Sequence, residues 1–390
     1  MRKYLFLLLL LFQFPLLAQQ DREAVLVVSG GGARGAWGGG VAQQLVREQG
    51  KDYATVVGTS TGSLLAPFIL LKDFEDLRRF YTTVEQRDIF SLNPFRKNGQ
   101  LKTLNLVFRV LFGAKTLGKS KNLRKLIDRS LPLDVYERVL DSGNVIVTVV
   151  NFNNSKIKYF SNRDFDSRGQ ELAGLKGGKH KKALKQKEAQ REQFLNWMWA
   201  SANQPVVMSL YETRDEQGEK QFWVDGGIRE NVAIIRGLEE LLALPEGSAP
   251  DSATLDVIVN NTIKPQLDEI RRPRIVSSLF HTINILSFDT RANDTRIPAD
   301  ITLQMEDMAA VLNYLERCEP EPDDQIITIN LYYMKQTTLD ISPESLLFEP
   351  EKMSKLWDAG TNYRNSASVL TYQISRSYGR ALVQAFKETH

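Results

Sequence analysis

The sequence has 390 residues, of which 42% are hydrophobic, so it is long enough to bury one large core or two smaller ones. Its formal net charge is +3, and a charge so nearly balanced does not favour nucleic-acid binding. The one cysteine, Cys318, excludes an internal disulfide. Because the chain has only this cysteine and three histidines, a Cys/His zinc cluster is also disfavoured. We expect neither a metal site nor a nucleic-acid partner.

The first residues are typical of a secretory signal peptide. Arg2 and Lys3 precede an apolar run over residues 4–12, and a cleavage point is expected after Ala18. The run is too short for a comfortable transmembrane helix, although an uncleaved N-terminal anchor is the alternative. Removal of residues 1–18 takes away two positive charges and brings the formal net charge to +1. We expect export to the periplasm, the outer-membrane surface or the extracellular space.

The next segments alternate between strand and helix patterns. Ala24–Val28 is a continuous apolar run that ends in glycines, which predicts a buried parallel strand. A helix is expected over residues 36–49, a second strand over 54–57 and a second helix over 60–71. This β-α-β-α order predicts an α/β fold with a mainly parallel central sheet flanked by helices.

Further strands are expected along the rest of the chain. One pair is predicted over residues 145–150 and 156–160, and a hairpin over 206–211 and 221–224. Single strands are expected over residues 255–259 and 326–332, and a helix over the last thirty residues. No linker divides residues 20–390, which favours a single domain over residues 19–390, with a signature core at 24–235 and a C-terminal elaboration at 236–390.

Residues 163–193 differ in character from the rest of the chain. They hold few large apolar groups, which predicts a surface excursion or a mobile loop. Their six lysines could attract anionic lipid, but a solvated loop without a partner is at least as well supported. These lysines are Lys176, Lys179, Lys181, Lys182, Lys185 and Lys187.

A G-x-S-x-G motif follows the second predicted strand, with Ser60 at its centre. A tight strand-to-helix turn exposes a serine hydroxyl and places the helix N-terminus under the reacting centre. Gly58 and Gly62 are needed because a Cβ at either position would crowd the strand against the helix that crosses it. The motif predicts Ser60 as a nucleophile, with Gly58 and Gly62 forming the nucleophile elbow.

A glycine loop follows the first predicted strand. Consecutive glycines let backbone amides converge, which predicts an oxyanion hole for the charge that forms when a serine attacks an ester. The same loop matches the G-x-G-x-x-G dinucleotide fingerprint, which needs an acidic residue at the end of the second strand. Asp52 lies before that strand, so a dinucleotide-dependent oxidoreductase is the lesser alternative and no cofactor is expected. The candidate oxyanion residues are Gly30, Gly31, Gly32, Ala33, Arg34, Gly35 and Thr61.

The base that would activate Ser60 is not an obvious histidine. His180 lies in the lysine-rich segment, and His390 is the last residue. His281 lies in an apolar helical stretch typical of a packing histidine, so a Ser-His-Asp triad built on it is a lesser alternative.

Asp225 is the other candidate base. It ends a predicted strand and is followed by Gly226 and Gly227, so it projects from a turn with free space beside it. Burial beside Trp223 would raise the carboxyl pKa and make direct proton abstraction from Ser60 feasible. On these residues alone, a structural turn aspartate is an equal alternative.

Taken in order, residues 30–35, 58–62 and 225–227 resemble the three signature blocks of the patatin-like phospholipases. Ala200-Ser201-Ala202, followed by Pro205, resembles the segment that precedes the third block. The resemblance covers about residues 24–235. It implies a three-layer fold related to the α/β-hydrolases and a Ser-Asp dyad without histidine.

Carried over to this chain, the resemblance makes Ser60 the nucleophile and Asp225 the general base. It implies an oxyanion hole formed by the amides from Gly31 to Ala33 together with that of Thr61. The implied reaction is hydrolysis of acyl esters of glycerolipids without a metal. The chain departs from the family in the threonines that flank Ser60 and in its lysine-rich segment.

A secreted lipid acyl hydrolase of the phospholipase A or lysophospholipase type, acting through an acyl-enzyme, is therefore the expected function. Its partners would be a phospholipid or another acyl-glycerol substrate, with peripheral membrane contact. A non-catalytic membrane-surface protein with a relic site is the alternative, which would bind lipid and show no turnover.

Overall fold

The computed structural model describes residues 24–96, 102, 109, 111–164, 178–244, 253–262, 325–342 and 344–389. The predicted signal peptide, Cys318, His281 and His390 lie outside these residues. Of the helices that the structure describes, none combines the length and the apolar character needed to cross a membrane.

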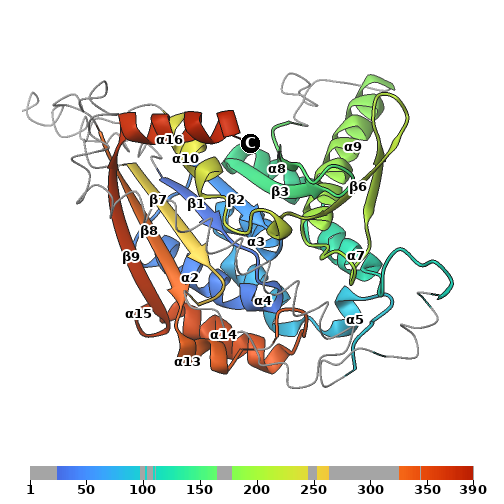
Figure 1. Cartoon of the computed structure of the whole chain (residues 1–390), viewed down its shortest axis with the longest axis horizontal. Helices are drawn as coiled ribbons and strands as arrows, with labels where there is room; N and C mark the ends of the chain where they lie inside the picture. Colours follow the sequence, from blue (N-terminus) through green and yellow to red (C-terminus); the bar gives the residue numbers. More distant parts are fainter. Residues whose placement is uncertain are drawn as a thin grey trace, which may run out of the picture.

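A nine-stranded mixed sheet lies at the centre of the molecule (Figure 1). Its strands are β1 (Ala24–Val28), β2 (Thr55–Thr59), β3 (Asn144–Asn151), β4 (Ile157–Ser161), β5 (Tyr211–Arg214), β6 (Lys220–Asp225), β7 (Ala253–Val259), β8 (Ile326–Met334) and β9 (Ala367–Ser375). They run in the order β5-β6-β3-β2-β1-β7-β8-β9, and β4 pairs with β3 off this path. The five central strands from β3 to β8 are parallel, and β4, β5, β6 and β9 pair antiparallel.

Helices cover both faces of the sheet. One face packs against α2 (Gly35–Arg47), α3 (Thr61–Leu70), α4 (Phe74–Thr83), α7 (Lys121–Ser130), α8 (Leu133–Ser142), α9 (Gly178–Ser201) and α14 (Pro350–Thr361). The other packs against α10 (Ile234–Leu242) and α16 (Arg376–Thr389). Short helices are α5 (Gln86–Ile89), α13 (Gln336–Asp340) and α15 (Tyr363–Ser366), with 3-10 turns η1 (Gly32–Arg34) and η2 (Gly226–Ile228).

The alternation of side chains along β1 explains the two cores. Leu26 and Val28 point to the face covered by α2 and α3, whereas Val25 and Val27 point to the face covered by α10. All four side chains are buried, as expected for a parallel strand with helices on both sides. The predicted three-layer α/β fold with a mainly parallel sheet is confirmed.

Three predicted elements are wrong in part. Residues 178–193 form the first part of α9 rather than a loop, because lysine, alanine, leucine and glutamine are strong helix formers. Residues 367–375 form β9, which pairs with β8 along its whole length, so only the end of the chain is helical. The hairpin strand begins at Tyr211 rather than at Val206, because Val206 has φ of +71°, which an extended strand does not allow.

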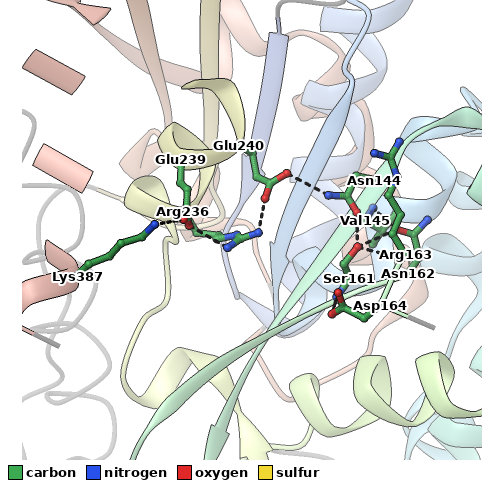
Figure 2. A network of polar contacts seen from close by, with 10 residues as sticks. All are labelled: Asn144, Val145, Ser161, Asn162, Arg163, Asp164, Arg236, Glu239, Glu240 and Lys387. Atoms are coloured by element: carbon green, nitrogen blue, oxygen red, sulfur yellow. Dashed lines mark hydrogen bonds and ion pairs between the residues drawn. The ribbon is translucent and has the colours of Figure 1, made fainter. Parts of the chain in front are cut away.

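The C-terminal third is built into the same sheet, since β7 pairs directly with β1. Figure 2 shows a polar network that extends this connection across α16, α10 and β3. Lys387 on α16 pairs with Glu239, which also pairs with Arg236 at 2.9 Å. Arg236 pairs in turn with Glu240, whose carboxylate accepts a hydrogen bond from Asn144 at 3.1 Å. Asn144 is the first residue of β3, so this network lies at the end of β3 away from Thr148 and Asp225.

Candidate active site

The three predicted signature blocks meet at one edge of the sheet. Val28 at the end of β1 is in register with Gly58 near the end of β2, so the glycine loop and the serine turn leave neighbouring parallel strands side by side. The carboxyl edge of a parallel sheet is where such folds bind ligands. Asp225, at the end of β6, is in register with Val149 on β3, which is the other neighbour of β2.

The turn at Ser60 has the strained geometry of a nucleophile elbow. Ser60 has φ of +55° and ψ of −122°, a region that L-residues rarely occupy, and it is the N-cap of α3. A Cβ on Gly58 would lie 2.4 Å from the carbonyl carbon of Gly62. A Cβ on Gly62 would lie 2.1 Å from the carbonyl oxygen of Val28. Both glycines are therefore required by close approach of the strands to α3.

Ser60 and Asp225 are brought together by this arrangement. The Asp225 carboxylate accepts a hydrogen bond at 2.8 Å from the backbone N–H of Gly227, and the Ser60 side chain lies beside the same carboxylate. Burial raises the pKa of Asp225 from 3.8 to about 6, although the Ser60 side chain and the Gly227 amide oppose the rise. Asp225 is only 8% exposed, whereas Ser60 is half-buried. The site thus holds a carboxylate able to take a proton near neutral pH beside a reachable hydroxyl.

Gly226 and Gly227 have different roles in the turn after Asp225. A Cβ on Gly226 would lie 2.5 Å from the carbonyl oxygen of Thr148 on β3, so glycine is needed for the turn to pack against that strand. Gly227 contributes its amide to the Asp225 carboxylate.

The predicted set of oxyanion donors is too large. The amide of Gly30 donates to the carbonyl of Asn231, and that of Ala33 donates to the carbonyl of Ser345 at 2.8 Å. Those of Arg34 and Gly35 close the turn of η1 itself. Four of the predicted donors are thus engaged inside the protein. Within the described residues, the amides that make no such hydrogen bond are those of Gly31, Gly32 and Thr61.

A C-terminal segment over the glycine loop was not predicted from the sequence. A Cβ on Gly32 would lie 1.9 Å from the Ser345 carbonyl oxygen, and Gly32 has φ of +56°. Gly32 is therefore required by backbone geometry, and we expect its substitution to disturb folding as well as the site. Arg34, one of the candidate oxyanion residues, has its pKa lowered by burial, and the nearby Glu344 opposes that effect.

Two asparagines near the loop were also missed. The carbonyl of Asn231 accepts the Gly30 amide, and the side chain of Asn260 donates to the carbonyl of Ser29 at 2.9 Å. Asn260 directly follows β7, the parallel neighbour of β1. The sequence signal that could have revealed Asn260 is its position just after a predicted parallel strand, since polar residues in that position gather at the carboxyl edge of the sheet.

The competing predictions gain no support from the described residues. Asp52 lies ahead of β2 and pairs with Lys72 at 3.0 Å, while Thr59 occupies the end of β2 where a dinucleotide site needs a carboxylate. His180 lies near the start of α9, far along that helix from Ser201. In the part of the chain that the structure describes, no group of three His, Cys, Asp or Glu side chains could hold a metal ion.

The sequence model of the patatin-like phospholipases matches residues 26–236, which is more than half of the chain. The chain belongs to the patatin-like phospholipase family. No curated protein matches it significantly. Among solved structures it is similar to VipD from Legionella pneumophila, with 13% sequence identity and a TM-score of 0.33. That similarity covers 90% of this chain and 68% of VipD.

Membership of this family makes the protein a lipid hydrolase that acts on lipid substrates. The matched region begins within β1 and ends in α10, so it contains the glycine loop, the Ser60 turn and the Asp225 turn. The segment over the loop, from 344 to 348, lies beyond the match. This member of the family therefore completes the surroundings of its site with residues from outside the family region.

Proposed function

We propose that the protein is an exported serine esterase that hydrolyses acyl ester bonds of phospholipids through a Ser60–Asp225 dyad. The observation that carries the proposal is the placement of the Ser60 side chain beside the buried Asp225 carboxylate, at the edge of the sheet where β1, β2 and β6 end. Family membership supplies the lipid substrate class, and the pair supplies a nucleophile with its base.

The proposed reaction has two halves. Ser60 Oγ attacks the ester carbonyl carbon while its proton passes to Asp225, and the new oxyanion faces the amides of Gly31, Gly32 and Thr61. When the intermediate collapses, the bond to the glycerol oxygen breaks and that oxygen takes the proton from Asp225. A water molecule then gives a proton to Asp225, attacks the acyl-Ser60 ester and releases the fatty acid, and the proton returns to Ser60.

Export remains part of the proposal because residues 1–18 lie outside the described structure. The charged start and the apolar run that follows support cleavage after Ala18. Expressed with its full N-terminus in a Gram-negative host, the chain is expected to appear in the periplasmic or extracellular fraction with Gln19 as its first residue. Intact-mass measurement of that fraction is the check. A full-length mass in the inner-membrane fraction would favour the uncleaved anchor instead.

Membrane contact through the lysine-rich segment, residues 163–193, stays a prediction. Lys181, Lys182 and Lys185 are exposed on α9, whereas Lys187 pairs with Glu137 at 2.6 Å. A helix rises 1.5 Å per residue, so Lys185 lies roughly 24 Å along α9 from Ser201. These lysines are therefore too far from Ser60 to hold the substrate head group in the site.

Lipid product analysis tests the proposed reaction. Purified mature protein, incubated with vesicles of mixed phospholipids, is expected to release free fatty acid and a lysophospholipid in equal amounts at the first cleavage. Mass spectrometry of the extracted lipids measures both products. Binding to the vesicles without any product would contradict the proposal and favour a relic site.

A further inference from the structure

Ser201, the last residue of α9, touches the backbone of the proposed nucleophile. Its Oγ accepts a hydrogen bond from the Ser60 backbone N–H at 2.9 Å and donates one to the carbonyl of Thr148 on β3 at 2.7 Å. Both directions are fixed, since an amide can only donate and a carbonyl can only accept. Ser201 is completely buried, so no water replaces either bond.

The amide that Ser201 binds belongs to the strained residue of the site. Ser60 keeps φ of +55° only where its surroundings hold it there. The direction of the Ser60 N–H depends on the φ angle of Ser60. Because the Ser201 hydroxyl holds this N–H in place, the hydrogen bond resists rotation of the turn toward a relaxed conformation.

The same end of α9 also holds the proposed base. Two residues beyond Ser201, the carbonyl of Asn203 accepts the backbone N–H of Asp225 at 3.0 Å. Thr148, which accepts the Ser201 hydroxyl, packs its carbonyl against Gly226, the residue after Asp225. The end of α9 therefore binds the backbone of both residues of the pair. Ser201 accepts the amide of Ser60, and Asn203 accepts the amide of Asp225.

We propose that Ser201 is a positioning residue that, with the carbonyl of Asn203, sets the distance between Ser60 and Asp225. This inference rests on the proposed function, because it assigns Ser201 a part in the reaction of those two residues. Ser201 does not touch the substrate; it acts through the Ser60 backbone. An error of about 1 Å in the position of a reacting group can lower a rate by about 100-fold.

The test compares Ser201→Ala with a matched control, Ser161→Ala. Ser161 is also a buried serine whose Oγ accepts a backbone amide, that of Arg163 at 2.9 Å, and donates to an oxygen, Asn144 Oδ1, at 2.5 Å. It lies on β4 opposite Ile146, two residues before Thr148 on β3, and belongs to the network of Figure 2, which contacts neither Ser60 nor Asp225. Both substitutions remove a hydroxyl that bridges two polar groups, but only one of these hydroxyls touches the site.

The readouts are kcat and KM for a short-chain nitrophenyl ester, the rate of covalent labelling by a fluorophosphonate, and the melting temperature. For Ser201→Ala we expect kcat and the labelling rate to fall by about 100-fold, with KM within about three-fold of wild type. For Ser161→Ala we expect a lower melting temperature with kcat unchanged. Should Ser201→Ala not fold, Ser201→Cys replaces it; its weaker hydrogen bonds are expected to lower the labelling rate by about ten-fold.

The possible outcomes separate the two proposals. A wild-type protein that neither hydrolyses esters nor reacts with the fluorophosphonate would contradict the proposed function. An active wild type, together with a Ser201 variant that keeps its kcat and labelling rate, would overturn the positioning role alone. Equal losses of kcat in the Ser201 and Ser161 variants would also overturn it, since both would then reflect stability.

Discussion

Substitution of Ser60 by alanine is expected to lower ester hydrolysis by about 10⁵-fold or more, because the proposed reaction then loses its nucleophile. The alanine keeps the strained backbone conformation at φ of +55°, so the melting temperature should remain close to that of the wild type. Hydrolysis of the short-chain nitrophenyl ester and circular dichroism on the same preparation measure both quantities. Loss of activity with an unchanged fold would identify a chemical role.

Ser60→Gly separates strain from chemistry at the same position. Glycine adopts positive φ without steric cost, so this variant should be as inactive as Ser60→Ala but more stable by about 1 kcal/mol. Ser130→Ala serves as the control, because Ser130 lies on α7 and its hydroxyl bonds only the carbonyl of Leu126. Wild-type turnover in either Ser60 variant would contradict the assignment of Ser60 as the nucleophile.

Substitution of Asp225 by asparagine is expected to lower kcat by about 10³-fold or more while stabilising the fold at neutral pH. Asparagine has the same shape and can still accept the Gly227 amide, but it cannot take the Ser60 proton. In the wild type, kcat/KM should fall about ten-fold per pH unit below about pH 6, where Asp225 becomes protonated. A pH–rate profile measures that limb.

The effect on stability follows from the same carboxyl group. Its pKa is about 6 in the folded protein and near 3.8 in the unfolded chain, so the folded state prefers the protonated form. The stability that Asp225 contributes is therefore present below pH 3.8 and is lost as the pH rises through 6. At 1.36 kcal/mol per pKa unit, ionisation removes about 3 kcal/mol. Asp225→Asn avoids this loss, and its advantage over wild type should grow between pH 4 and pH 7.

Urea unfolding of both proteins across that pH range is the measurement. The neighbouring Glu230 also has its pKa raised by burial, to about 7, but it is common to both proteins and largely cancels in the comparison. Equal stability differences at pH 4 and pH 8 would mean that Asp225 is not a buried carboxylate of raised pKa. An active Asp225→Asn protein would show instead that another group serves as the base.

Local signals were strong enough to predict the core of the fold. The runs that became β1, β2, β3 and β7 are predominantly apolar and are followed by polar or glycine residues, and burial of a parallel strand on both faces demands such runs. Segments without a large apolar stretch were predicted less well. The start of α9 depends on helix propensity, and β9 pairs as an edge strand beside β8, which no local pattern announces.

At the site, the sequence by itself determined which chemical groups are present and which turns carry them. Gly58, Ser60 and Gly62 form a local turn whose steric demands can be worked out from the motif alone. Which amides stay free for an oxyanion depended on partners far along the chain, such as Ser345 for Ala33 and Asn231 for Gly30. Only the tertiary structure brought Asp225 to Ser60 and placed Ser201 behind the turn, because strand order and helix packing decide contacts between distant residues.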